Sequence, residues 1–257
     1  MPENPKISIV TVALNSAKYI ESNIESVMVQ SYKNREHIII DGKSSDGTVD
    51  IIRKYENNID HWISEPDGGI AEAMNKGIDR ATGDYVLFLN SDDYLIDSMA
   101  LENVSSYLVD SLDIYIFKVL FLYNDGKTLP SLNNSLGYLT YFKMGSCHQG
   151  QIHSRTMLLK LGKFDTNLRI NFDYDLMLRA YKNGASSKSI DIFISVMRQV
   201  GISSRRDWTG FKQRYDEEKL VHRKNSDSKF MWMVYEVYWL LYIPYRFIRY
   251  IFIVLNK

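Results

Sequence analysis

Apolar residues in the first third of the chain follow two alternating patterns. Short, almost continuously apolar runs, such as residues 7–14 and 85–89, are typical of strands buried on both faces. Between them, apolar residues recur every three or four positions, as in helices with one buried face. The predicted strands span residues 7–14, 37–40, 61–63 and 85–89, and the predicted helices span residues 17–30, 46–55 and 70–81.

Strands that alternate with helices in this way predict an α/β fold, with a mostly parallel sheet covered by helices on both faces. Ligands of such sheets bind beyond the carboxyl ends of the strands. Polar clusters follow three of the predicted strands, at residues 11–15, 41–46 and 90–93. The pattern therefore predicts that the chemistry lies in these strand-following loops.

The pattern is looser after residue 93. A helix over residues 98–110 and an aromatic-rich strand over residues 114–123 precede Asn124-Asp125-Gly126, a typical turn sequence. A short helix over residues 176–181 follows a polar loop and ends at Asn183-Gly184, which has the composition of a helix C-cap. One more strand is predicted over residues 190–196.

Residues 203–257 differ in composition from the rest of the chain. They contain eleven Lys and Arg against six Asp and Glu, and residues 230–255 are dense in aromatic and aliphatic side chains. Charged residues and Pro244 interrupt that stretch, so neither half reaches the roughly 20 apolar residues that span a bilayer. Two interpretations stay open: a helix in the headgroup region of a membrane, or a pair of helices packed on the domain. We divide the chain into a domain over residues 1–202 and an extension over residues 203–257.

Length and composition narrow the function classes. A chain of 257 residues is long enough for one catalytic domain with an extension. Lys plus Arg and Asp plus Glu number 31 each, and this balance argues against a nucleic-acid-binding protein. Cys147 is the only cysteine, which excludes an internal disulfide, and residues 1–8 lack the features of a signal peptide. We expect a cytoplasmic protein, peripheral at the inner face of the cell membrane if the extension contacts lipid.

Two carboxylates follow the predicted strand over residues 85–89, in the sequence Asn90-Ser91-Asp92-Asp93, which we call the carboxylate box. Mg²⁺ and Mn²⁺ prefer oxygen ligands and commonly complete their shell with substrate phosphates, so a metal-diphosphate site fits here. Taken alone, the segment is more typical of a turn in which Ser and Asp cap the next helix. The neighbouring segments decide between the two.

Several segments accompany the carboxylate box at plausible spacing: residues 8–15 (SIVTVALN), 41–48 (DGKSSDGT), 64–69 (SEPDGG) and 71–77 (AEAMNKG). Together with residues 87–93 they resemble the family 2 glycosyltransferases, whose catalytic domains have the GT-A fold. The resemblance covers roughly residues 6–200. It implies an enzyme that transfers sugar from a nucleotide-sugar donor.

The resemblance also implies roles for single residues. The aspartate at the position of Asp41 holds the nucleoside base, typically uracil, and the first loop lines the same pocket. Asp92 coordinates the metal that bridges the diphosphate, and Asn90 lies nearer the ribose. Asp93 is either a further group of this site or a helix cap. The donor-binding residues implied in this way are Thr11, Ala13, Asn15, Asp41, Asp46, Lys76, Asn90, Ser91 and His148.

Three of these positions have open interpretations. Lys76 lies near the phosphates or is a solvated lysine near a helix C-terminus. Asn90 stands where many relatives have Asp, and an amide removes one negative charge, which lowers metal affinity. His148 lies in Ser146-Cys147-His148-Gln149-Gly150, which resembles a His-Gln segment of bacterial members. It contacts the diphosphate or the acceptor, or it is structural.

The resemblance implies sugar transfer with inversion, which needs a carboxylate that deprotonates the acceptor hydroxyl. The segment Asn171-Phe172-Asp173-Tyr174-Asp175 resembles the acceptor-side motif of the family, and this alignment makes Asp173 the base. Phe172 replaces an acid that often precedes the base and makes its surroundings more apolar. Asp175 is the alternative base, or a carboxylate at a helix N-terminus. Arg179 orients the loop of Asp173 or is an exposed helix cation.

We therefore predict an inverting glycosyltransferase that uses a nucleotide sugar, with UDP as the expected nucleotide, and Mg²⁺ or Mn²⁺. The predicted acceptor is a hydroxyl of a glycan or of a polyprenyl-linked saccharide. Two alternatives have weaker support: a nucleotidyltransferase, which would need a triphosphate-binding loop, and a nucleotide-sugar-binding module with degraded catalysis. Asn90 and Phe172 keep the second alternative open.

Overall fold

The structure is a computed structural model of the chain, and it describes residues 4–200 and 208–255. The described residues form one nine-stranded sheet with the strand order β3-β2-β1-β4-β8-β6-β9-β5, and β7 pairs with β6 beside this path. The strands are β1 (Ile7–Ala13), β2 (Arg35–Asp41), β3 (His61–Ser64), β4 (Tyr85–Phe88), β5 (Tyr94–Leu95), β6 (Ile114–Leu122), β7 (Thr128–Pro130), β8 (Gln151–Ser154) and β9 (Ser187–Arg198).

The first four strands of the order are parallel, as the alternation of strands and helices predicted. β1 pairs in parallel with β2 on one side and with β4 on the other, and β3 pairs in parallel with β2. Beyond β4 the directions are mixed: β8 is antiparallel to β4 and β6, whereas β6 and β9 are parallel. The carboxyl ends of β1, β2 and β4 therefore meet at one edge of the sheet.

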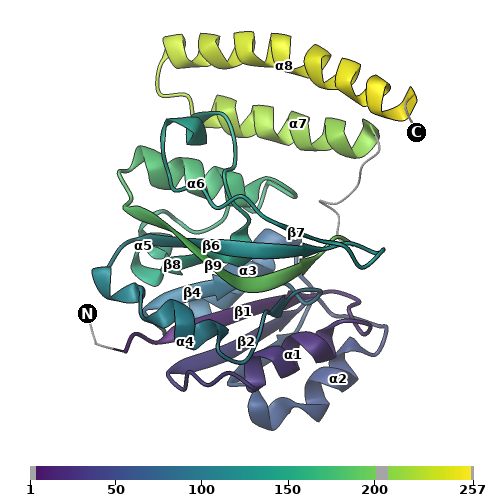
Figure 1. The fold of residues 1–257 in the computed structure, drawn as a ribbon, viewed down its shortest axis with the longest axis vertical. Coiled ribbons are helices and arrows are strands. Elements are labelled where there is room, and N and C mark those ends of the chain that lie inside the picture. Colours follow the sequence, from purple (N-terminus) through teal and green to yellow (C-terminus); the bar gives the residue numbers. More distant parts are fainter. Residues whose placement is uncertain (1–3, 201–207, 256–257) are drawn as a thin grey trace.

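Helices cover both faces of the sheet (Figure 1). On one face α3 (Ile70–Arg80), α5 (Arg155–Lys160) and α6 (Phe172–Lys182) enclose a core that includes Val10 and Val12 of β1. On the other face α1 (Ile20–Met28), α2 (Thr48–Lys54) and α4 (Ala100–Ser105) pack on the opposite side chains of the same strands. A Cβ at Gly77 would lie 2.2 Å from Cγ1 of Val10, so only glycine permits this approach of α3 to β1.

The predicted elements of residues 7–89 are all present, with ends shifted by at most three residues. The helix predicted over residues 98–110 is shorter, because only α4 and a 3₁₀ turn at Leu108–Asp110 form there. The helix predicted over residues 176–181 begins earlier, at Phe172, because Phe172 and Tyr174 are buried and extend its apolar face. β5, β7 and α5 were not predicted, since they are too short to show a period.

Two long helices form the extension, α7 (Trp208–Lys224) and α8 (Lys229–Leu255). They lie as a layer over α6, with α8 outermost, and the ribbon of α8 bends near its middle, where Pro244 interrupts the helix (Figure 1). Among the described residues no helix is long and apolar enough to cross a membrane. The predicted boundary between residues 202 and 203 lies outside the described residues.

The extension is joined to the domain through a buried histidine. His222 of α7 is 0 % exposed and stacks on Tyr235 with 4.2 Å between ring centroids. The indole N–H of Trp239 donates to its Nδ1 (2.9 Å), so the neutral imidazole carries its proton on Nε2, 2.7 Å from the hydroxyl of Tyr174. This chain of contacts joins α8, α7 and α6. The side of the extension that faces α6 therefore packs on the domain, as one of the two interpretations expected.

Burial lowers the pKa of His222 to about 4, whereas an unfolded chain protonates histidine near pH 6.5. As the pH falls below 6.5, His222 is protonated in the unfolded chain but stays neutral in the folded protein. The free energy of unfolding therefore falls towards pH 4. We expect the wild-type protein to lose about 2 kcal/mol more unfolding free energy than the His222→Gln variant between pH 7 and pH 5. Urea denaturation at both pH values measures this difference.

Substitution of the exposed His61 by Gln is the control and should leave the pH dependence as in the wild type. Equal pH dependence of the wild type and the His222→Gln variant would contradict the burial of a neutral His222.

Candidate active site

Three polar loops meet where β1, β2 and β4 end. The backbone N–H of Asn15 donates to Oγ of Ser44 (2.8 Å), and Oδ1 of Asn15 accepts from the N–H of Ser45 (3.0 Å). Asn15 has a φ of 49°, a left-handed conformation that asparagine tolerates well. On the other side, the hydroxyls of Ser16 and Ser91 are 2.7 Å apart. The structure thus brings together the three loops that the strand pattern selected.

Asp41 ends β2 and is 0 % exposed. Its carboxylate accepts hydrogen bonds from the N–H and the hydroxyl of Ser44 and from the hydroxyl of Ser64. The carboxylate therefore lies beneath Ser44 and fixes the loop, and Asn15 with Ser44 forms the accessible rim above it.

Asp46 holds two loops together. Its carboxylate accepts from the N–H of Ala17 (3.0 Å) and from the N–H and hydroxyl of Thr48 at the start of α2. Burial opposes ionisation, but these hydrogen bonds outweigh it and keep the pKa of Asp46 below its usual value. In this structure Asp46 has the geometry of a helix-capping and loop-bridging residue.

Thr11 and Ala13 of β1 are directed into the interior. The hydroxyl of Thr11 lies 3.1 Å from Oδ1 of Asn23 and 3.0 Å from Nε2 of His37. Ala13 packs with Ile20, Ile24 and other side chains of α1 and α2, and its carbonyl accepts from the N–H of Gly42. Both residues therefore support, from the protein interior, the loops that follow β1 and β2.

Lys76 of α3 lies among acidic groups. Its ammonium is 2.9 Å from Glu65 and 3.4 Å from Glu72, and it donates to the carbonyl of Pro66. The hydrogen bond to Glu65 raises the pKa of Lys76. These contacts fix the connection between β3 and α3 and leave the cation neutralised.

Asp92 and Asp93 of the carboxylate box differ sharply in their surroundings. Asp93 is 1 % exposed and accepts from Nε2 of Gln149 (2.9 Å) and the N–H of Arg198 (3.1 Å). The carboxylate of Asp92 accepts no hydrogen bond from any other described residue. Burial raises the pKa of both, and for Asp93 the charge of Asp92 adds to the effect. Asp92 is therefore the member of the box that is open to an external ligand.

The open carboxylate of Asp92 fits a divalent cation. Mg²⁺ and Mn²⁺ take oxygen ligands and are commonly held by one or two carboxylates together with substrate phosphates. The described residues contain no group of three or more His, Cys, Asp or Glu that could hold a metal. Asp92 is the carboxylate of the box that could bind such a cation.

Asp173 lies in the first turn of α6 and faces the carboxylate box across a histidine. Its Oδ1 accepts from the N–H of Tyr174 (2.7 Å), and its Oδ2 lies 3.2 Å from Nδ1 of His148. Nε2 of His148 lies 3.2 Å from Nδ2 of Asn90. The side chains of His148 and Asp173 are 13 % and 21 % exposed, so both are partly accessible. The predicted acceptor side and the predicted donor side are thus in direct contact.

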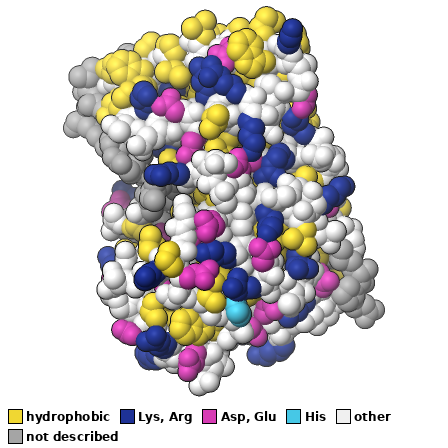
Figure 2. Space-filling model, turned by 180° about the vertical axis from the view of Figure 1, so that it is seen from behind, with side chains coloured by type: hydrophobic (Ala, Val, Ile, Leu, Met, Phe, Trp, Pro, Cys, Tyr) yellow, Lys and Arg dark blue, Asp and Glu magenta, His cyan; other side chains and the backbone are white. Residues whose placement is uncertain are grey.

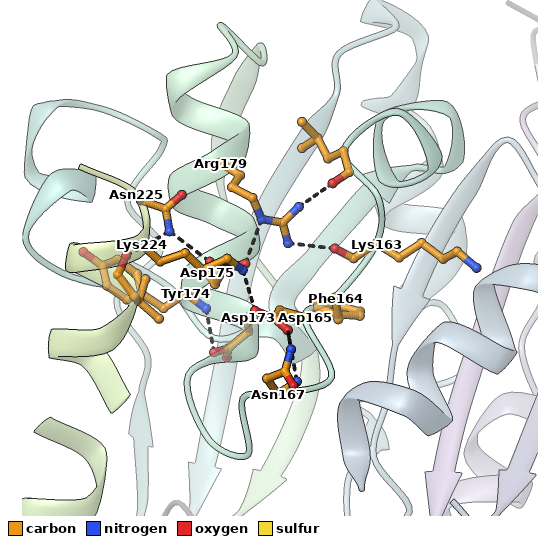
Figure 3. Close-up of polar contacts among 12 residues, drawn as sticks. Lys163, Phe164, Asp165, Asn167, Asp173, Tyr174, Asp175, Arg179, Lys224 and Asn225 are labelled. Atoms are coloured by element: carbon orange, nitrogen blue, oxygen red, sulfur yellow. Dashed lines mark hydrogen bonds and ion pairs between the residues drawn. The ribbon is translucent and has the colours of Figure 1, made fainter. Parts of the chain in front are cut away.

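Asp175 is engaged elsewhere (Figure 3). It is 0 % exposed and accepts from Nε of Arg179 (2.7 Å) and Nδ2 of Asn225 (2.9 Å). Arg179 also donates to the carbonyls of Leu161 and Lys163, so the pair ties α6 to α7 and to the turn after α5. These contacts favour Asp173 over Asp175 as the base. They also indicate that Arg179 stabilises the packing of α6.

Phe172 precedes Asp173, the predicted base, and its side chain points into the core. It is 4 % exposed and packs on Phe164 with 5.4 Å between ring centroids. Its ring lies 6.4 Å from that of His148. Phe172 therefore anchors the start of α6, and among the described residues the imidazole of His148 is the side-chain group from outside α6 that contacts the carboxylate of Asp173.

Two supports of the site carry no sequence motif. Glu217 of α7 accepts hydrogen bonds from three consecutive backbone N–H groups, those of Arg169, Ile170 and Asn171, at 2.8 to 2.9 Å. These residues lead directly into Asp173. Arg198 at the end of β9 donates to the carbonyl of Asp92 (2.6 Å) and lies over the ring of Tyr94. The sequence signal for these two residues is weak: Arg198 is a charged residue at a strand end, and Glu217 is a charged residue in a helix.

The model of the family described as "Glycosyl transferase family 2" matches residues 8–165, more than half of the chain. The chain belongs to this family. Its match to an uncharacterised glycosyltransferase of Mycobacterium tuberculosis is 31% identical over 185 residues, 70% of each chain. A putative teichuronic acid biosynthesis glycosyltransferase of Bacillus subtilis, TuaG, is 45% identical over 93 residues, 35% of this chain and 36% of the relative. The protein is therefore a family 2 glycosyltransferase.

Solved structures show the same fold at low identity. Residues 1–349 of Staphylococcus aureus TarS, in complex with UDP-GlcNAc, give a TM-score of 0.66 at 20% identity, over 87% of this chain and 68% of that one. The mannosyltransferase PcManGT of Pyrobaculum calidifontis, in complex with GDP-Man and Mn²⁺, gives 0.68 at 16% identity, over 94% and 72%. These likenesses confirm the predicted GT-A fold of this family 2 enzyme.

Removal of the Glu217 carboxylate should loosen the segment that leads into Asp173. We expect the Glu217→Ala variant to lose on the order of tenfold in kcat, because catalytic groups need close positioning, and to keep its donor affinity. Steady-state kinetics and donor titration measure the two effects.

Asp216→Asn is the matched control, because Asp216 is exposed, precedes Glu217 and pairs only with Lys212 on the same helix among the described residues. A Glu217→Ala variant with the kcat of the Asp216→Asn variant would show that α7 does not position the loop.

Proposed function

We propose that this family 2 enzyme transfers a sugar with inversion from a UDP-sugar to a hydroxyl of a glycan or a polyprenyl-linked saccharide, with Asp173 as the base. One observation carries the proposal: the imidazole of His148 bridges the donor-side Asn90 and the acceptor-side Asp173. The only carboxylate of the box without a hydrogen bond from another described residue, that of Asp92, belongs to the same strand end.

Asp173 has the features that the reaction needs. Its carboxylate is partly exposed and lies at the N-terminus of α6, next to the donor side. As the acceptor oxygen bonds to the anomeric carbon, its proton passes to Asp173, and the bond between that carbon and the diphosphate oxygen breaks. The nucleoside diphosphate leaves with the electron pair. A bound Mg²⁺ or Mn²⁺ at Asp92 would offset the negative charge on the leaving diphosphate.

The donor nucleotide would lie against the rim formed by Asn15 and Ser44. Asp41 holds Ser44 from below, and Thr11 and Ala13 support the loops, so these residues act on the nucleotide through the rim in the conformation described. Oδ1 of Asn90 is buried and has no hydrogen-bond partner among the described residues, which leaves an unused acceptor beside the proposed donor site. A UDP-sugar agrees with the ligand of the TarS structure, and a GDP-sugar with that of PcManGT.

The Asp173→Asn variant should lose at least about 100-fold in transfer rate, because the amide cannot take the proton, and should keep donor binding. The Asp92→Asn variant should lose the stimulation of transfer by Mn²⁺. Transfer to a saccharide acceptor, measured with and without Mn²⁺, tests both. Donor binding is followed by the shift in thermal unfolding across a panel of UDP- and GDP-sugars.

Turnover of the Asp173→Asn variant at the wild-type rate would refute the assignment of the base. Release of inorganic pyrophosphate in place of a nucleoside diphosphate would indicate the nucleotidyltransferase alternative. Tight donor binding by the wild type without transfer or donor hydrolysis would indicate the binding module.

We also propose that the enzyme attaches peripherally to the cytoplasmic face of the membrane through α8. Exposed apolar side chains recur along the outer side of this helix with a helical period, and exposed Lys229 and Arg249 accompany them. Hydrophobic side chains gather where α8 forms the edge of the molecule in Figure 2, with basic side chains beside them. The stripe includes Phe230, Met233, Val237, Leu240, Leu241 and Ile248.

The Leu240→Glu/Leu241→Glu double variant should lose binding to vesicles that contain anionic lipid, because it places two charges in the apolar stripe. Flotation of protein with vesicles measures this loss. Val109→Glu, at an exposed apolar residue outside the extension, is the control and should float with the vesicles as the wild type does. A wild-type protein that stays in the soluble fraction would refute the attachment.

A further inference from the structure

His148 is held in place by the backbone around it. It begins a short 3₁₀ turn, His148–Gly150, that precedes β8. The side chain of Gln149 donates to Asp93, and the carbonyl of Gln149 accepts from the hydroxyl of Ser195 (2.8 Å). A Cβ at Gly150 would lie 2.5 Å from the carbonyl oxygen of Phe117, so the turn sits directly on β6. The imidazole is therefore carried by a segment that is anchored at the two residues following His148.

The contacts of His148 define where its proton lies when Asp173 is ionised. An ionised carboxylate only accepts hydrogen bonds, so Nδ1 carries the proton and donates to Oδ2 of Asp173. In a neutral imidazole Nε2 is then an acceptor, and Nδ2 of Asn90 is the group that donates to it. The amide of Asn90 matches this tautomer, whereas a carboxylate at the same place would have no proton to donate.

We infer that His148 is a positioning residue for Asp173, and that Asn90 selects the imidazole tautomer that can do this. The inference rests on the proposed role of Asp173 as the base. Oδ1 of Asp173 is fixed by the N–H of Tyr174 in its own helix, and Oδ2 is fixed by His148. The two hydrogen bonds together fix the orientation of the carboxylate. In this arrangement Asn90 serves the base as well as the donor.

Two substitutions separate the two ends of the imidazole. Asn places its amide nitrogen near the position of Nδ1, where it can donate to Asp173. Gln places its amide group near the position of Nε2, where its carbonyl oxygen can accept from Nδ2 of Asn90. His148→Asn should therefore keep a donor for Asp173, whereas His148→Gln should keep only the contact with Asn90. We expect His148→Ala and His148→Gln to lose on the order of 100-fold in kcat, and His148→Asn to recover a large part of that loss.

The KM for the donor and the donor-induced shift in thermal unfolding should stay at wild-type values in all three variants, because His148 acts through Asp173. Each variant's unfolding temperature without donor shows whether it is folded. A kcat for His148→Ala equal to that of the wild type would overturn the inference, and so would a loss confined to donor KM. Equal kcat values for the Asn and Gln variants would overturn it as well.

A spectroscopic measurement tests the role of Asn90 independently of turnover. Nitrogen NMR of labelled histidine should show the Nδ1–H tautomer for His148, assigned by comparison with the His148→Gln variant. Asn90→Leu removes the amide donor at similar size and should reduce the population of this tautomer. An unchanged tautomer in the Asn90→Leu variant would refute the role of Asn90.

The Asp173→Asn variant distinguishes this inference from the proposed function. If Asp173→Asn turns over at the wild-type rate, the base assignment fails. If Asp173→Asn is inactive while His148→Ala keeps the wild-type kcat, the base assignment stands and only the positioning role fails.

Discussion

The parallel pairing of β1 with β2 on one side and with β4 on the other is the constraint on which the site depends. Because parallel strands end at the same edge, the sheet brings three loops that are far apart in sequence to one place. The hydrogen bonds between Asn15 and Ser44 and between Ser16 and Ser91 then fix the loops against one another. The sheet itself therefore brings together the loops of the proposed donor side.

The acceptor side is built differently. Asp173 is not at the end of a central parallel strand, so its position has to be set by separate contacts. The backbone before it is held by Glu217 of α7, and its carboxylate is held by His148 of the segment before β8. The proposed base thus depends on elements on both sides of it in sequence, and on a helix that lies outside the matched family region of residues 8–165.

The periodicity of the sequence was sufficient for the first half of the fold and for the site's location, because buried strands and amphipathic helices have regular patterns there. Periodicity was insufficient to predict the surroundings of single side chains, because the same residue type can be exposed to ligand at one position and bonded within the protein at another. Asp92 and Asp93 are adjacent and chemically identical, yet Asp93 is closed off by Gln149 and Arg198, which are distant in sequence. In the same way, nothing in the sequence around Asp46 or Lys76 showed that each is already paired within the protein. The extension was ambiguous because its inner side packs through His222 while its outer side stays apolar.

The hydrogen bonds from residues 169–171 to Glu217 have a consequence for the order of synthesis. The loops after β1, β2 and β4 have all been synthesised by the end of the carboxylate box, whereas Glu217 of α7 is synthesised later. A nascent chain therefore contains these three loops before the segment that leads into Asp173 can be anchored. The anchor of Asp173, the proposed base, forms only after Glu217 has been synthesised, so a chain that terminates before Glu217 would carry the three loops and an unanchored Asp173.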